Sequence, residues 1–212
     1  MTPFPLILSA PSGGGKTRIA QELRLRRADV GYSVSCTTRT PRAGERDGVD
    51  YYFLTQAAFD TARERGDLAE WAVVHGNYYG TLRSEVERVM GAGKHVIMDI
   101  DVQGAAQFAE SFPDAVLVFV LPPSLEVMLE RLASRGSESR ESLLVRLESA
   151  RKELGAVSSY QYVVLNDALD DAVARVSAII DAESVRRGRV ADLDGRIREL
   201  IAQLTRTIAS HH

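Results

Sequence analysis

Three consecutive glycines followed by a lysine and a threonine stand near the N-terminus, at residues 13–17. An apolar run at residues 6–9 precedes them, and the spacing of Ile19, Ala20 and Leu23 predicts a helix behind them. Glycine backbones can turn successive N–H groups toward an anion, and the N-terminus of the helix adds positive charge. A strand, a glycine loop and a helix in this order therefore predict a phosphate-binding loop.

Within this loop, Lys16 is expected to reach the terminal phosphates of a nucleotide and Thr17 to bind magnesium. The usual pattern begins with glycine, whereas this chain has Ala10 at that position. An ordinary glycine-rich turn is the weaker alternative, because such a turn does not require Gly-Lys-Thr between a strand and a helix. The loop residues expected to bind ATP are Ala10, Pro11, Ser12, Gly13, Gly14, Gly15, Lys16 and Thr17.

Length and composition restrict the remaining possibilities. The chain has 212 residues, 45% of them hydrophobic, which is enough for one domain with insertions or at most two small domains. Its 26 basic and 29 acidic residues give no overall attraction to polyanions, so we expect no nucleic acid partner. We also expect no membrane partner and a cytoplasmic location, because no apolar stretch approaches the roughly 20 residues of a membrane span. Cys36 is the only cysteine, and His75 and His95 lack metal-ligand spacing, so both histidines are expected to be structural.

Alternating apolar and amphipathic segments predict an α/β fold. Buried strands are expected at residues 6–9, 95–100, 116–121 and 162–165, and helices are expected to begin near Thr17, Val102, Ser124 and Leu169. This alternation predicts a P-loop parallel-sheet core wrapped by helices. Ligands should therefore gather at the carboxyl ends of the strands.

Three segments depart from this alternation. Residues 33–80 are rich in Thr, Arg, Gly and Tyr and predict an inserted, mainly β subdomain between core segments 1–32 and 81–188. The polar residues 134–147 separate two helical segments and predict a small lid. Residues 189–212 predict an amphipathic helical extension, with apolar positions at Leu193, Ile197, Leu200, Ile201, Leu204 and Ile208. Acidic residues are interleaved with its arginines, which favours a packing or homodimerisation helix over RNA or membrane binding.

The run at residues 37–54 reads TTRTPRAGERDGVDYYFL, and with it the chain resembles the guanylate kinases. The signature positions are Thr37, Thr38, Arg39, Arg42, Glu45, Gly48, Tyr51, Phe53 and Leu54. The resemblance extends from residue 6 to about residue 187. It implies ATP-dependent phosphorylation of GMP and dGMP to GDP and dGDP, with Mg²⁺ as cofactor.

The residue chemistry suits a nucleoside monophosphate as acceptor. Arg39 and Arg42 can grip a phosphate dianion bidentately, and Tyr51 and Tyr79 can add hydroxyl donors. The resemblance implies that these four residues hold the GMP phosphate. A solvated surface hairpin would be the alternative for an isolated pair of arginines.

For the base, a carboxylate can accept hydrogen bonds from both N1–H and the 2-amino group of guanine, and the resemblance implies that Glu70 does so. The full GMP-binding set that the resemblance implies is Ser35, Arg39, Arg42, Glu45, Tyr51, Glu70, Tyr79, Thr81 and Asp101. Asp99 ends a predicted strand, where a carboxylate can orient magnesium-bound water. Which of Asp99 and Asp101 faces the metal and which the base stays open.

A GMP phosphate is already ionised near neutral pH, because its second pKa is about 6, so no general base is required. Catalysis then consists of alignment and charge neutralisation. The resemblance implies that Arg135 and Arg146 in the lid close over the phosphates and that Asn166 and Asp167 lie beside the adenine. Arg131 lies one helical turn before Arg135 and is expected on the ATP side. The expected catalytic residues are Lys16, Arg42, Arg135 and Arg146.

Two other functions compete with this interpretation. A guanylate-kinase-like scaffold would bind protein partners without catalysis, but it has no need for Gly-Gly-Gly-Lys-Thr or for two lid arginines. A P-loop kinase for another small phosphorylated acceptor is the nearer alternative. Glu70, together with the complete arginine and tyrosine set, argues against it.

Overall fold

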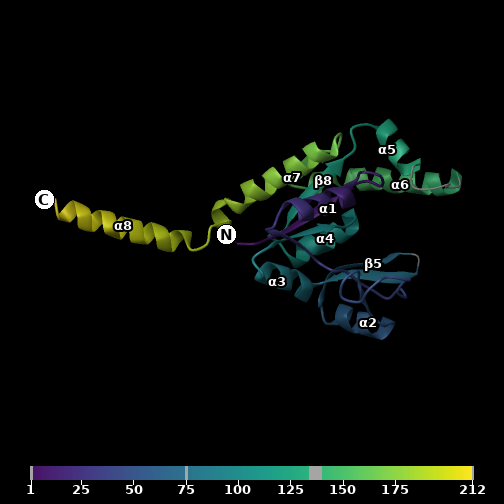
Figure 1. Cartoon of the computed structure of the whole chain (residues 1–212), viewed down its shortest axis with the longest axis horizontal. Helices are drawn as coiled ribbons and strands as arrows, with labels where there is room; N and C mark the ends of the chain where they lie inside the picture. The colour runs from purple at the N-terminus through teal and green to yellow at the C-terminus, as the bar shows by residue number, and fades with distance from the viewer. Residues whose placement is uncertain (1, 75, 134–139, 212) are drawn as a thin grey trace.

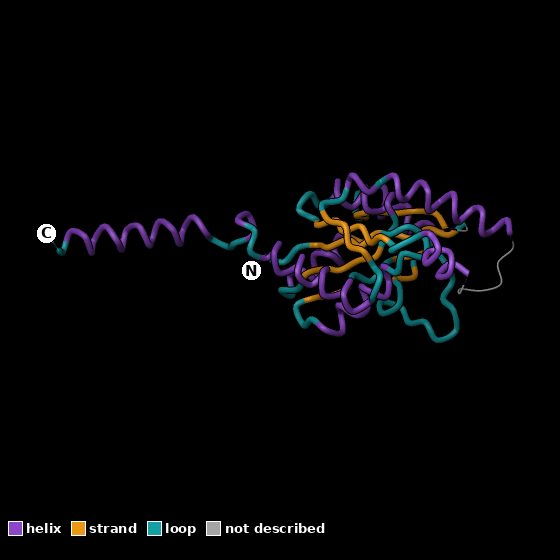
Figure 2. Tube along the Cα trace, turned by 90° about the horizontal axis from the view of Figure 1, so that it is seen from above, coloured by secondary structure: helices purple, strands orange, loops and turns teal. Residues whose placement is uncertain are grey.

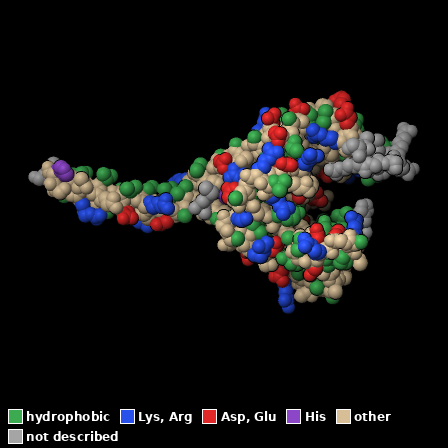
Figure 3. All heavy atoms as spheres, viewed as in Figure 1, with side chains coloured by type: hydrophobic (Ala, Val, Ile, Leu, Met, Phe, Trp, Pro, Cys, Tyr) green, Lys and Arg blue, Asp and Glu red, His purple; other side chains and the backbone are tan. Residues whose placement is uncertain are grey.

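The computed structural model describes residues 2–74, 76–133 and 140–211. Figure 1 shows a body of sheets covered by helices, from which the C-terminal helix projects to one side. At the opposite end of the body, two parts of the chain face each other across a gap that the space-filling view also shows as a hollow (Figures 1 and 3).

The core is a five-stranded parallel sheet. It consists of β1 (Pro5–Ser9), β2 (Val30–Tyr32), β7 (His95–Asp99), β8 (Val116–Leu121) and β9 (Tyr162–Leu165), in the spatial order β2-β7-β1-β8-β9. Every pairing between neighbouring strands is parallel. The four predicted strands are confirmed. The edge strand β2 was not predicted, because only Val30 of its three residues is a buried apolar side chain.

Helices cover both faces of this sheet (Figure 2). On one face α1 (Lys16–Arg26) and α7 (Leu169–Ser184) pack on Leu6 and Leu8. On the other face α3 (Arg83–Gly91) and α4 (Val102–Ser111) pack on Ile7. Successive side chains of a strand point to opposite faces, so the continuous apolar run of β1 serves both layers. All four predicted helix starts are confirmed to within one residue.

The predicted insert contains a second sheet. It consists of β3 (Cys36–Thr37), β4 (Tyr52–Phe53), β5 (Leu68–Val74) and β6 (Asn77–Leu82), in the order β4-β3-β6-β5. Helix α2 (Gln56–Glu64) covers it and buries Phe59 against Cys36 and Leu68. This helix was not predicted, since only one of its side chains is buried and its apolar pattern is short.

Two helices form the part of the body that faces the insert across the gap (Figure 1). These are α5 (Leu125–Ala133) and α6 (Arg140–Gly155), which share a small core of Met128, Leu132, Leu147 and Ala150. The prediction that residues 134–146 interrupt the helices was wrong for 140–146, which are already helical. Arg, Glu and Leu favour helices, so the polarity of this stretch does not mark a loop. Residues 134–139 of the predicted lid lie outside the described residues.

The extension leaves the body after Arg189. A 3₁₀ turn (Val157–Ser159) precedes β9, and a second one (Arg187–Arg189) precedes the extension. Arg189 is buried: its Nη2 donates to the Asp114 carbonyl at 2.8 Å, and its guanidinium lies 4.1 Å from the centroid of the Phe4 ring. Helix α8 (Leu193–Ala209) then runs free of the body, and no residue of it is buried. No helix among the described residues is both long and apolar enough to cross a bilayer.

The histidine prediction is confirmed for His95. This residue is buried, and its ring lies 4.2 Å from that of Phe4 (centroid to centroid). Burial lowers the pKa of its imidazole, so the ring is neutral in the core. His75 lies outside the described residues.

Candidate functional site

The glycine loop connects β1 to α1, as predicted. Gly13 and Gly15 have φ of +85° and +89°, a region that favours glycine, and the Gly14 N–H donates to the Pro11 carbonyl at 2.8 Å. A Cβ added to Gly14 would lie 2.5 Å from the Cβ of Ala10. Ala10 is therefore accommodated at the usual glycine position because the residue facing it has no side chain.

The loop presents backbone donors to an anion. In the part of the chain that the structure describes, the N–H groups of residues 13 and 15–17 donate to no protein acceptor. They gather at the N-terminus of α1, where the helix dipole favours negative charge. The side chain of Lys16 begins at the same place and makes no ion pair with any described residue. The backbone donors and the lysine together suit a polyphosphate anion.

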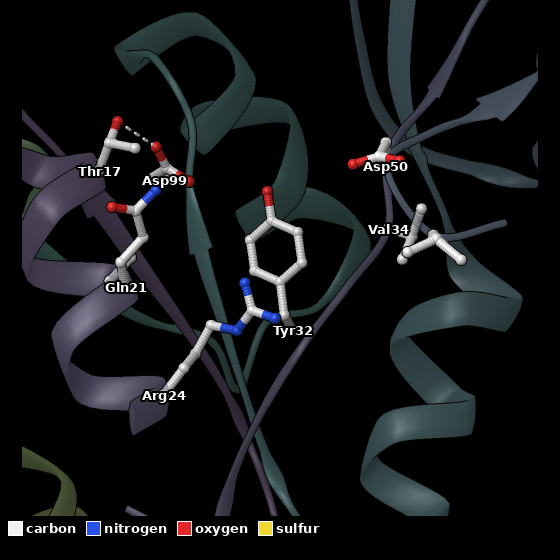
Figure 4. Close-up of a pocket in the computed structure, with 9 residues that line it drawn as sticks. Thr17, Gln21, Arg24, Tyr32, Val34, Asp50 and Asp99 are labelled. Atoms are coloured by element: carbon white, nitrogen blue, oxygen red, sulfur yellow. Dashed lines mark hydrogen bonds between the residues drawn. The ribbon is translucent and has the colours of Figure 1, made fainter. Parts of the chain in front are cut away.

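A hydroxyl and a carboxylate meet beside this loop. The Thr17 Oγ1 donates to Asp99 Oδ2 at 2.6 Å, across the junction of α1 and β7. Figure 4 shows this pair at one wall of a cavity of about 290 Å³, with Val34 and Asp50 of the insert on the far side. Hydroxyl and carboxylate oxygens are ligands that Mg²⁺ accepts, directly or through water. The donor set at this position therefore fits a magnesium ion.

A second cavity lies on the other side of the loop. It has a volume of about 450 Å³ and is lined by Gly13, Gly15, Arg18, Arg131, Asn166, Asp167 and Leu169. The Asn166 side chain donates to the Gly14 carbonyl at 2.8 Å, and Arg131 Nη2 donates to the Asn166 carbonyl at 3.0 Å. The structure thus brings the predicted adenine-side residues into one cavity that adjoins the phosphate loop.

In the insert, an arginine is held in place by a carboxylate. Arg39 Nη2 lies 2.8 and 2.9 Å from the two carboxylate oxygens of Glu45, and the Arg42 N–H donates to Glu45 Oε2 at 2.8 Å. The hydrogen bond from Arg39 lowers the pKa of the Glu45 carboxyl. The Arg39 guanidinium lies 5.5 Å from the centroid of the Tyr51 ring, which lies 6.0 Å from that of Tyr79. These side chains form a cluster at one end of the second sheet, whereas the side chain of Arg42 is exposed.

The predicted base-reading carboxylate is buried. Glu70 on β5 is 8% exposed, and its Oε1 accepts a hydrogen bond of 2.6 Å from the Thr81 hydroxyl on β6. Burial raises the pKa of the Glu70 carboxyl to about 7, and the nearby Asp101 charge adds to the rise. A Cβ at Gly104 would lie 3.0 Å from Glu70 Oε2, so the bare backbone of α4 makes room for this carboxylate.

The two aspartates after β7 have different partners. Asp99 accepts from Thr17, whereas Asp101 accepts from the N–H groups of Gln103 and Gly104 at 2.9 and 2.8 Å. Asp101 is thus the N-cap of α4 and lies near Glu70. This arrangement favours Asp99 for the metal and Asp101 for the base side.

Three further residues were predicted at the site: Ser35, Arg135 and Arg146. Ser35 is half-buried next to β3, and its carbonyl accepts from the Tyr52 N–H at 2.9 Å. Arg146 lies on α6, and its Nη2 is 3.5 Å from the Ser12 hydroxyl of the loop. Arg135 lies outside the described residues.

Several residues around the site were not predicted. Arg24 and Tyr32 line the cavity beside Thr17, with the guanidinium 4.4 Å from the ring centroid (Figure 4). Burial raises the pKa of the Tyr32 hydroxyl to about 12, so it stays a neutral donor. Glu153 accepts a hydrogen bond from the Ser12 N–H at 2.9 Å. No sequence signal could have found this contact, because 141 residues separate its partners.

A family model described as guanylate kinase matches residues 2–183. A guanylate kinase of Clostridium perfringens (strain SM101 / Type A) is 45% identical over 201 residues, which cover 94% of this chain and 93% of that protein. A guanylate kinase of Desulfitobacterium hafniense (strain Y51) is 46% identical over 181 residues, which cover 85% of this chain and 90% of that protein. The crystal structure of guanylate kinase from Anaplasma phagocytophilum is similar with a TM-score of 0.71 at 32% identity, with 95% of each chain covered.

Proposed function

The chain belongs to the guanylate kinase family and transfers a phosphoryl group from ATP to GMP, and we propose that its residues divide this task between two sides of the gap. The donor side is the glycine loop with the cavity beside it. The acceptor side is the insert. The residues that follow are our assignments.

On the donor side, Lys16 and the N–H groups at the start of α1 bind the ATP phosphates. The adenine occupies the cavity lined by Arg131, Asn166 and Asp167, which is open next to the loop. Thr17 would hold Mg²⁺ directly, and Asp99 would hold it through a water molecule. When it is bound, the metal ion neutralises part of the phosphate charge. Arg146, which approaches Ser12 from α6, binds the phosphates from the opposite side.

On the acceptor side, Arg39, Arg42, Tyr51 and Tyr79 bind the phosphate of GMP. Glu45 keeps Arg39 in position through its bidentate contact. The base enters between Glu70, Thr81, Ser35 and Asp101. An ionised Glu70 accepts from N1–H and from the 2-amino group of guanine, which no other common nucleobase offers together.

The reaction then needs alignment more than proton transfer. An oxygen of the GMP phosphate attacks the γ-phosphorus of ATP, and a new P–O bond forms as the bond to the β,γ-bridging oxygen breaks. The electron pair leaves with ADP, and no proton has to be removed because the phosphate is already a dianion. Lys16, Arg42 and Arg146 are the cations that offset the charge on the transferred group.

The observation that best supports this proposal is the buried carboxylate of Glu70, which accepts a hydrogen bond from Thr81. It gives the acceptor side a means to select guanine. A substrate panel tests it: ADP release with GMP, dGMP, AMP, UMP and CMP. We expect turnover with GMP and dGMP, since neither the Glu70 contact nor the phosphate contacts involve the 2′-hydroxyl. Equal turnover with AMP would indicate a P-loop kinase of different specificity, and no turnover with any acceptor would indicate a binding scaffold.

We further propose that the protein is a homodimer of the cytoplasm, where ATP and GMP are available. Leu193, Ile197, Leu200, Leu204 and Ile208 follow one another at spacings of three and four residues along α8, and the last four are exposed. This spacing suits a two-helix coiled coil, and an isolated helix of this length is marginal in water. The second copy of α8 is therefore its expected partner.

A further inference from the structure

The glycine loop is contacted from outside by the helix pair α5 and α6. Gly13 is close to α5, since a Cβ at this position would lie 3.2 Å from the Met128 carbonyl and 3.3 Å from Leu132. Ser12 is contacted by α6 at two points: Glu153 Oε2 accepts from its N–H at 2.9 Å, and Arg146 Nη2 lies 3.5 Å from its hydroxyl. The loop residue just before the glycines is therefore bound by a carboxylate and an arginine of one helix.

The two α6 residues share one face of that helix. Arg146 and Glu153 are seven residues apart, which is close to two turns and about 10 Å along the axis. The neighbouring face carries Leu147 and Ala150, which pack on α5. The hydrogen bond of Glu153 to Ser12 therefore joins the loop to the same face of α6 that carries Arg146.

A carboxylate in this place has an electrostatic cost. The loop is built to attract phosphate, and a negative charge next to it weakens that attraction. Its compensating effect is a charge-assisted hydrogen bond to a backbone N–H, which is stronger than one between neutral groups. Ser149 adds a weaker contact of 3.4 Å to Glu153 Oε1, so the carboxylate has a partner on α6 itself.

We propose that Glu153 is a positioning residue that holds α6 on the loop so that Arg146 is aimed at the transferred phosphate. The proposal rests on the role assigned to Arg146 above. Glu153 itself does not contact substrate. Its removal should lower kcat through misplacement of Arg146 and leave the GMP KM nearly unchanged, because the hydrogen bonds of Glu153 join it to Ser12 and Ser149 on the donor side.

The experiment compares Glu153→Ala, Glu153→Gln, Arg146→Ala and the double variant Arg146→Ala/Glu153→Ala by steady-state kinetics and melting temperature. We expect Glu153→Ala to lower kcat about tenfold with the GMP KM within twofold, since misplacement by about 1 Å can cost this much or more. Glu153→Gln keeps an acceptor oxygen and should retain most of the turnover. In the Arg146→Ala background, Glu153→Ala should cause no further loss. Glu148→Ala is the matched control, because Glu148 lies on the same helix and pairs with Arg151 at the surface.

Three results would overturn the proposal. The first is a wild-type kcat in Glu153→Ala. The second is a reduction of kcat by Glu153→Ala that is equally large with Arg146 and with Ala at position 146. The third is an equally large reduction of kcat in Glu148→Ala. If Glu153→Ala does not fold, Glu153→Gln decides alone, and a tenfold loss there contradicts the hydrogen-bond role. A wild-type kcat in Arg146→Ala would refute the assigned role of Arg146 and, with it, the proposal for Glu153. A reduced kcat in Arg146→Ala together with a wild-type kcat in Glu153→Ala would refute only the role of Glu153.

Discussion

In the proposed function, the two sides of the gap recognise their nucleotides by different means. The acceptor side uses side chains that hold one another: Glu45 fixes Arg39, and Thr81 fixes Glu70. The donor side uses the backbone of the glycine loop, with Lys16 as its one cation inside the loop. A phosphate chain looks the same on every nucleotide, so N–H groups suffice there, whereas one base can be told from another only by specific donors and acceptors.

This difference determines how each side should respond to substitution. On the donor side most side chains can change as long as the backbone keeps its path, which Ala10 at a usual glycine position illustrates. On the acceptor side the loss of one member leaves its partner misplaced or buried without a hydrogen bond.

Lys16 is the exception on the donor side. Lys16→Met should fold normally and lower kcat by about 10²- to 10³-fold, because it removes a cation opposite charge that develops in the transition state. Steady-state kinetics with a melting curve measures this, with the exposed Lys94→Met as control. Near-normal turnover in a folded Lys16 variant would show that the loop is not the ATP site.

The pH dependence should reveal Glu70 on the acceptor side. The pKa of its carboxyl is about 7, so below pH 7 the group is protonated and cannot accept both donors of guanine. We expect kcat/KM for GMP to fall by up to about tenfold per pH unit below 7, since binding then requires loss of a proton. Glu70→Gln should lack this limb and keep only the titration of the GMP phosphate near pH 6. Identical profiles for both proteins would contradict the assignment.

The same carboxyl links stability to pH. In the unfolded chain it ionises near its ordinary pKa of 4.5, so between pH 4.5 and 7 the folded protein binds the additional proton. Its contribution to stability is therefore present below pH 4.5 and lost as the pH rises to 7. The melting temperature of Glu70→Gln relative to the wild type should accordingly increase over this interval; a constant difference would contradict the raised pKa.

Glu45 tests whether the acceptor side depends on its internal contacts. Glu45→Ala should raise the GMP KM about fivefold and change kcat less, because Arg39 loses the partner that orients it. Initial rates at varied GMP measure this. Glu64→Ala is the matched control, since Glu64 is an exposed carboxylate on the same insert. An unchanged KM would mean that Arg39 is positioned without Glu45.

The extension should matter least for the reaction. Deletion of residues 190–212 keeps Arg189, which is anchored on the body, and removes α8. We expect kcat and both KM values to remain within twofold and the molecular mass in solution to fall to that of a monomer. Light scattering and kinetics on the same sample measure both. A dimer that survives the deletion would show that α8 is not the interface.

Local patterns were enough to predict four of the five core strands, four helix starts, the loop and the tail helix. Each of these segments carries an apolar period or a glycine signal of its own. Strand β2 was missed because only Val30 of its three residues is buried, and helix α2 because Phe59 is its one buried side chain. The first turns of α6 were missed because their sequence is largely polar. Helices and strands were thus predictable where the burial of one face produces a repeating pattern of apolar residues in the sequence.

The site divides in the same way. Residues within a motif, such as Lys16 or Arg39, could be proposed as site residues from spacing and resemblance. The contacts between Thr17 and Asp99, Arg131 and Asn166, or Ser12 and Glu153 join distant parts of the chain, and only the fold reveals them. Asp99 and Asp101 illustrate this, because their different partners are visible only in three dimensions.

The most direct test of the contrast between the two sides is the ratio of kcat/KM for GMP to that for AMP, in the wild type and in Glu70→Gln. AMP offers a bare N1 acceptor and no 2-amino group, so the wild type should prefer GMP by about 10⁴-fold or more. Glutamine replaces one acceptor oxygen by a donor that faces a donor. In Glu70→Gln, kcat/KM for GMP should fall steeply while kcat/KM for AMP stays the same or improves, so the ratio should fall by about 100-fold or more. A ratio that stays at the wild-type value would contradict this prediction, since Glu70 would then not be the residue that recognises guanine.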